Sequence, residues 1–110
     1  MSVSGFVVYK LTPPPEMKQE DFIRFVLDEV FPAVKMPSTR VGMIVELHLF
    51  TTDAADKYIW VIGWNGLPTD VVIPNEIADA RQKLESSGTL ISAPSDFYSE
   101  VGRWVRSAQS

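Results

Sequence analysis

The sequence predicts a single α+β domain in which two helices cover one antiparallel sheet. Three observations lead to this prediction: a long two-strand stretch from Thr39 to Gly66, two segments with apolar residues at helical spacing, and strand-like segments near both ends. With 110 residues, 45% of them hydrophobic, the chain is long enough for one hydrophobic core and too short for two. We therefore expect residues 1–110 to form one domain.

The first strand is expected from Gly5 to Leu11, which is rich in β-branched and aromatic residues and ends before three consecutive prolines. From Met17 to Lys35 the apolar residues recur at helical spacing, which predicts an amphipathic helix laid on a sheet. Phe31 breaks this pattern, and Pro32 follows it directly. Either the helix kinks or ends so that Phe31 turns inward, or Phe31 is an aromatic residue at a subunit contact or pocket mouth.

Val41–Phe50 and Tyr58–Trp64 have the composition of two long strands, and the polar stretch between them supplies a turn. The length of the loop decides the pairing of the strands. A four-residue loop places His48 opposite Val61, whereas a five-residue loop places it opposite Trp60. Only the longer loop would bring His48, Trp60 and Glu46 into one cluster.

The last part of the chain predicts a second helix and a final strand. Asn75 is suited to cap the start of the helix, and Gly88 suits its end. The buried side of the helix is expected to consist of Ile77, Ala80 and Leu84. The final strand is either 89–93, followed by a helix, or 98–105. Strand length favours 98–105, because a five-residue strand is a poor partner for such long neighbours.

This order of elements, strand, helix, strand, strand, helix, strand, is the ferredoxin-like βαββαβ arrangement, with a four-stranded antiparallel sheet and both helices on one face. The central hairpin, however, is apolar on both sides: Val45, Leu47 and Leu49 alternate with Ile44 and Phe50. Strands that are apolar on both sides need cover on both sides. The second cover is most economically another copy of the sheet, so we expect a homodimer with two sheets packed face to face.

Composition excludes several classes of protein. Ten basic and fourteen acidic residues give a net charge of -4, which argues against a nucleic-acid binder. With no Cys and one His, the chain cannot build a thiolate zinc site, an iron–sulfur cluster, a disulfide or a multi-histidine site, so we expect no metal and no cofactor. A leader sequence and a membrane-spanning segment are both missing from the pattern, which predicts a soluble, cytoplasmic protein that binds no membrane.

His48 is the strongest candidate for chemistry, since an imidazole in a half-dry pocket can take a proton near neutral pH. Glu46, two residues earlier, shares its strand face and can orient it. The structural alternative is a hydrogen bond across a dimer interface or at a solvent-exposed edge.

Aromatic residues and one arginine complete the candidate substrate site. Tyr58, Trp60 and Trp64 share one strand face, which is the wall of an aromatic pocket or simply core or dimer interface. Arg40 is placed to hold an anionic group, although a strand-edge arginine is usually a solvated charge. Phe31 belongs to the site if it lies at a pocket mouth.

The element order, the apolar hairpin and the segment DFIRFVLDEVFPAV resemble the dimeric α/β-barrel superfamily, which includes antibiotic-biosynthesis monooxygenases, EthD-like proteins and muconolactone-isomerase-like enzymes. EthD-like relatives carry an aromatic pair followed by His, a small residue and Pro; Phe22, Phe25 and Pro32 match this spacing. Val30 stands where that His would be, so nothing catalytic carries over there. The resemblance implies a pocket between helices and sheet for an aromatic or polyketide-like molecule.

Two expectations follow. The first is a cofactor-independent oxygenase or isomerase acting on a small aromatic or polyketide-like compound, with His48 as base. The second is a non-catalytic homodimer that binds an apolar small molecule or merely assembles. A closed pocket holding His48 and another polar side chain would favour the enzyme. A helix–sheet interface filled by side chains would exclude an enzyme with a helix–sheet pocket; the side chains in question are Phe22, Val26, Leu27 and Ile77.

Overall fold

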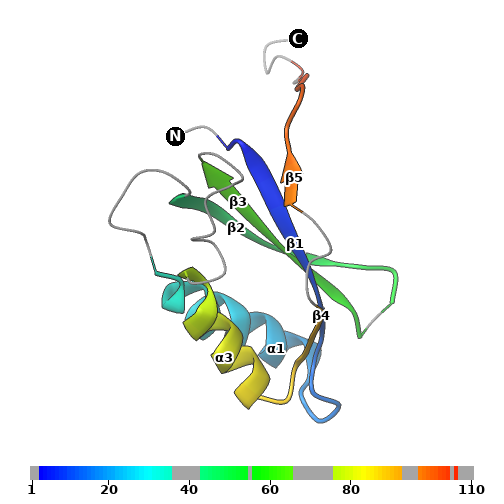
Figure 1. Ribbon diagram of the computed structural model, residues 1–110. Coiled ribbons are helices and arrows are strands. Elements are labelled where there is room, and N and C mark those ends of the chain that lie inside the picture. Colours follow the sequence, from blue (N-terminus) through cyan, green and yellow to red (C-terminus); the bar gives the residue numbers. More distant parts are fainter. Residues whose placement is uncertain are drawn as a thin grey trace.

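The computed structural model describes residues 3–35, 43–54, 56–65, 76–92, 97–104 and 106. These residues form an antiparallel sheet with two main helices packed side by side on one of its faces (Figure 1). The strand order is β2-β3-β1-β4, with β5 also paired to β1. The α+β class is thus confirmed, and the strand order is compatible with the ferredoxin-like arrangement.

Strand β1 (Gly5–Thr12) lies in the middle of the sheet and pairs with β3 (Tyr58–Asn65) along almost its whole length. Its side chains alternate between the two faces, as a strand requires. Val7 and Tyr9 are buried toward the helices, whereas Phe6 points to the opposite face and is only partly covered. Among the described residues, helices therefore cover one face of the sheet and leave the other face uncovered.

Strand β2 (Met43–Thr51) pairs with β3, so the predicted hairpin is present. His48 lies opposite Val61, which is the register of the shorter loop. The alternative cluster of His48, Trp60 and Glu46 is therefore not formed.

A β-bulge at Val45 interrupts the pairing between Ile44 and Glu46. One extra residue shifts the alternation of side chains, because successive residues of a strand face opposite sides. Ile44 therefore lies opposite Trp64 and is buried on the helix side. The sequence pattern had assigned Ile44 to the face of Phe50, and that assignment was wrong.

The first helical segment is not one regular helix. It consists of α1 (Gln19–Phe25), a π-helical turn η1 (Val26–Val30) and a 3₁₀ turn η2 (Phe31–Ala33). The N–H of Phe31 bonds to the carbonyl of Val26, five residues earlier, and the following Pro32 has no N–H to continue the ladder. The ring of Phe31 consequently turns inward and stacks on Trp60, with centroids 6.1 Å apart.

Helix α3 (Ala78–Ser86) covers the same face as α1. Its predicted stripe is confirmed, since Ile77, Ala80 and Leu84 are all 0% exposed. An ion pair of 2.9 Å between Lys35 and Asp79 ties the end of the first helical segment to α3. The helix ends before Gly88, whose φ of 94° is one that glycine adopts readily; the predicted cap Asn75 lies outside the described residues.

The fourth position in the sheet is shared by two short strands, β4 (Leu90–Ser92) and β5 (Phe97–Ser99). Both pair with the same edge of β1, β4 near its end and β5 near its start. The strand expected at 89–93 is present as β4, whereas one long final strand at 98–105 is not formed, and residues 97–104 are not the helix that the alternative required. Pro94 stands between the two strands in sequence and lacks the N–H that a continuous ladder would need.

The hydrophobic core fills the space between sheet and helices. Its completely buried side chains come from both layers: Leu11, Phe22, Val26, Val30, Trp60, Ile62, Ile77, Ala80 and Leu84. No helix within the described ranges has the length and apolar character needed to cross a bilayer.

Tyr9 gives the fold a pH dependence at the alkaline end. Burial raises the pKa of its phenol, and the nearby Arg81 guanidinium, 5.6 Å from the ring centroid, opposes only part of that rise. The folded chain therefore keeps the proton to a higher pH than the unfolded chain, and stability falls as pH rises above about 10.

We expect Tyr9→Phe to flatten this loss of stability, because the variant has no phenol to ionise. Urea unfolding between about pH 8 and pH 11 measures the slope. An undiminished slope in Tyr9→Phe would assign the effect to another group.

Candidate functional site

The helix-free side of the sheet, which we call the open face, contains a shallow hollow of about 520 Å³. Residues from β1, β2, β3 and β5 line it, and most of them are apolar: Phe6, Val8, Glu46, His48, Phe50, Val61 and Tyr98. The two predicted catalytic residues therefore lie at a mainly apolar surface contributed by four strands.

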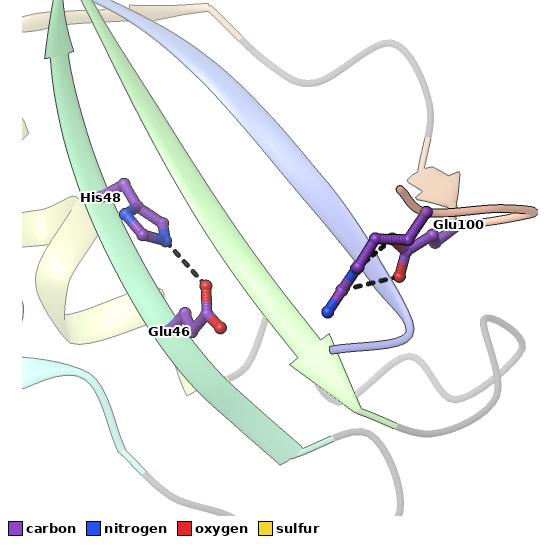
Figure 2. Close-up of polar contacts among 4 residues, drawn as sticks. Glu46, His48 and Glu100 are labelled. Carbon is purple, nitrogen blue, oxygen red and sulfur yellow. Dashed lines mark hydrogen bonds and ion pairs between the residues drawn. The ribbon is translucent and has the colours of Figure 1, made fainter. Parts of the chain in front are cut away.

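Glu46 and His48 point toward one another from β2 (Figure 2). His48 Nε2 lies 2.8 Å from Glu46 Oε1, because residues two apart in a strand project from the same face. The imidazole also stacks on Phe50, with centroids 5.7 Å apart and ring planes 15° apart. When Nε2–H donates this hydrogen bond to the carboxylate, Nδ1 carries the lone pair and can act as a base.

Gly63 makes room for this pair. It lies opposite Glu46 in β3, where a Cβ atom would come within 3.1 Å of the Glu46 Cβ and 3.3 Å of Val3. Gly63 was not predicted as part of the site, although an isolated glycine within a strand pattern often marks a close approach of two neighbouring strands.

A second ion pair follows β5, between Arg103 and Glu100. The guanidinium of Arg103 donates two hydrogen bonds to the carboxylate of Glu100, of 2.7 and 2.8 Å. The hydrogen bond and charge of Glu100 raise the pKa of Arg103, and the charge of Glu46 adds a smaller contribution. No sequence pattern links Glu46 with Arg103, which lie far apart along the chain.

The charged groups near the hollow are paired with one another, which limits the ligand. Glu46 contacts His48 and Glu100 holds Arg103, so neither cation is left without a carboxylate partner. Among the described residues, two carboxylates here engage one guanidinium and one imidazole. An apolar floor with this charge balance suits a neutral ligand and disfavours an anionic one.

The three predicted aromatic pocket residues lie on the other side of the sheet. Tyr58, Trp60 and Trp64 are at most 2% exposed and pack in the core beneath the helices. The structure thus brings them together with each other and separates them from His48. The indole N–H groups of Trp60 and Trp64 are buried, and neither has a hydrogen-bond partner among the described residues.

The remaining predicted residues are divided. Arg40 lies outside the described residues. Phe31, besides stacking on Trp60, lines a smaller hollow of about 270 Å³ along β2, together with Val34, Ile44, Val45, Glu46 and Leu47.

The interface between helices and sheet is filled with side chains. Phe22, Val26 and Ile77 are 0% exposed there, whereas Leu27 points outward and is half exposed. The pocket that contains His48 therefore lies on the opposite face from the one that the family resemblance implies.

Comparisons with family profiles, with curated proteins and with solved structures found no match. The resemblance to the dimeric α/β barrels accordingly rests on the element order and the hairpin pattern. Within the part of the chain that is described, no three His, Cys, Asp or Glu side chains gather as a metal site would require.

Proposed function

We propose that the protein is a cofactor-independent enzyme of the oxygenase or isomerase type, acting on a small neutral aromatic or polyketide-like compound held against the open face. The observation that carries this proposal is the 2.8 Å contact between His48 and Glu46 beside an apolar hollow. A positioned base next to an apolar surface is what removal of a proton from an activated carbon or hydroxyl requires.

His48 Nδ1 takes the proton, and Glu46 stabilises the imidazolium that forms. In an isomerase, the imidazolium returns the proton to a different carbon of the substrate. In an oxygenase, dioxygen is the co-substrate and oxidises the substrate anion. One oxygen atom of dioxygen becomes the carbonyl oxygen on the oxidised carbon of the substrate. The other oxygen atom leaves as water, together with the two hydrogens that this carbon loses. The substrate supplies all the electrons, so no external reductant is needed.

A second copy of the chain is proposed to close the site, because one copy leaves the hollow open. The side chains of His48 and Glu46 are 41% and 45% exposed, and Phe50 and Tyr98 are about half exposed. Two such faces packed against one another would remove this apolar surface from water and raise the strength of the electrostatic interactions within.

His48→Gln tests the role of the imidazole. We expect it to lower kcat/KM by about 10²- to 10⁴-fold, the usual contribution of a general base. Glu46→Gln should cost less, about tenfold, since it removes the orienting charge and keeps the base. Dioxygen consumption and exchange of carbon-bound hydrogen with deuterated water, measured on small naphthols and anthrones, report the two reaction types.

Glu29→Gln is the matched control, because Glu29 is an exposed carboxylate on η1, in the helix layer. It should leave turnover unchanged. Turnover of the His48→Gln variant at the wild-type rate would exclude the imidazole as the base.

A non-catalytic homodimer that binds an apolar molecule is the second candidate. It is favoured by the shallowness of the hollow and by the filled helix–sheet interface. Calorimetric binding of 1-naphthol without deuterium exchange or dioxygen consumption would select this function over the enzyme.

A further inference from the structure

The chain leaves the sheet after β5 as an extended segment, residues 100–104, which we call the C-terminal arm. Its base is fixed, because the Glu100 N–H donates to the Ser4 carbonyl at 2.9 Å. Beyond this bond the arm forms neither strand nor helix and runs away from the sheet (Figure 1).

The apolar side chains of the arm are exposed to solvent. Val101 is 102% exposed and Trp104 is 79% exposed, and a Cβ atom on Gly102 would meet nothing within 4 Å. The guanidinium of Arg106, 5.8 Å from the Trp104 ring, gives that ring only a partial cover. A tryptophan buries about 150–250 Å² when it packs, so Trp104 and Val101 offer a large apolar surface to a partner.

The same chain carries a matching acceptor, the hollow on the open face. Its apolar lining includes Phe50 and Tyr98, which are 50% and 52% exposed. In a single copy, Val101 and Trp104 are both exposed and neither lines the hollow. A second copy can supply both contacts at once, because a two-fold axis makes every exchange reciprocal.

The charges of arm and acceptor are complementary. Each chain has a net charge of -4, so two copies repel each other at long range. Arg103 is paired with Glu100 inside the arm, so the excess positive charge of the arm comes from Arg106 beside Trp104. The acceptor hollow contributes the carboxylate of Glu46, which also contacts His48. An arm laid on the open face of a second copy therefore brings positive charge to an acidic surface.

We propose that two copies exchange their C-terminal arms, so that Trp104 of each copy covers the hollow beside His48 of the other. This inference rests on the homodimer of the proposed function and makes each site dependent on a residue from both chains. Trp104 would form the roof of the ligand site, and Phe6, Val8 and Val61 its floor.

Crosslinking between copies tests the exchange directly. The chain has no cysteine, so Val8→Cys on the open face and Gly102→Cys in the arm each introduce the only thiol. The two variants are purified separately, one with a mass tag, then mixed and treated with a short bismaleimide. We expect tagged–untagged crosslinks between Val8→Cys and Gly102→Cys, and none when Glu29→Cys in the helix layer replaces Val8→Cys.

Trp104→Ala provides a second readout, since loss of a central aromatic anchor should raise the dimer Kd by about tenfold or more in sedimentation velocity. A wild-type dimer whose Val8→Cys and Gly102→Cys copies stay unlinked would overturn arm exchange and leave the homodimer intact. A monomeric wild-type chain would overturn both. The His48→Gln turnover assay tests the enzyme separately from either result.

Discussion

Gly5→Ala should lower the free energy of unfolding by about 2–3 kcal/mol, the upper range for overpacking a close contact. Gly5 lies in β1 between β3 and β5, where a Cβ atom would collide with the backbone carbonyl of Tyr98 and come within 2.7 Å of the Trp64 ring. Neither obstacle is the flexible end of a side chain, because one is backbone and the other is a fully buried indole. The strain is relieved only if β5 leaves the edge of β1.

Thermal unfolding followed by circular dichroism measures this effect, and a loss of about 10 °C in Tm is expected for a domain of this size. Gly102→Ala is the matched control, since its added methyl group meets open space and should change stability by less than about 0.5 kcal/mol. Equal Tm values for the two variants would contradict the close approach of β5 to Gly5.

Trp60→Ala is expected to have the largest effect on stability, about 3–5 kcal/mol. Trp60 is 0% exposed and lies between the rings of Tyr9 and Phe31, with centroid distances of 5.4 and 6.1 Å. Its removal leaves a cavity that the surrounding sheet and helices can close only in part.

Trp60→Phe separates the ring from its N–H group. The indole N–H is buried with no hydrogen-bond partner among the described residues, so a phenyl ring should retain most of the stability and cost less than about 1.5 kcal/mol. Leu90→Ala is the control for a large exposed residue, at 69% exposure, and should be nearly neutral. Urea unfolding gives all three values, and a small loss in Trp60→Ala would contradict its place in the core.

The hairpin could be predicted from sequence because both strands consist of residues with high strand preference, but its register could not. Side-chain bonds within the loop fasten the shorter connection. The Thr52 hydroxyl accepts from the N–H of Ala54 and donates to the carbonyl of Lys57, at 3.2 and 3.1 Å. The alternation of apolar and polar residues carries no information about such side-chain hydrogen bonds, so it was compatible with either loop length.

The bulge at Val45 and the divided fourth strand were missed for a different reason. Val45 is itself a good strand residue, and nothing in its local sequence marks it as the extra one. Its position depends on how β2 meets Gly63 across the sheet. β4 falls within the 89–93 alternative, whereas β5 is too short to be identified by periodicity, and what the two strands share is an edge of β1 that lies far away in sequence.

The candidate site shows the same division. Glu46 and His48 are two residues apart, so their common face follows from strand geometry alone. Tyr98 reaches the same surface only because β5 pairs with the start of β1. The side of the sheet on which His48 lies depends on where the helices pack, and the doubly apolar hairpin pattern left that choice open.

Because β1 is central, the order of synthesis and the order of assembly run in opposite directions. Every partner of β1 comes later in the chain: β3 begins at Tyr58, β4 at Leu90 and β5 at Phe97. On the ribosome, GFVVYKLT therefore emerges with both edges bare and must be shielded, by a chaperone or by transient collapse, while more than half of the chain is translated. Of the described strands, β1 is the first to be synthesised, and its second edge is paired only after β4 and β5 have been made.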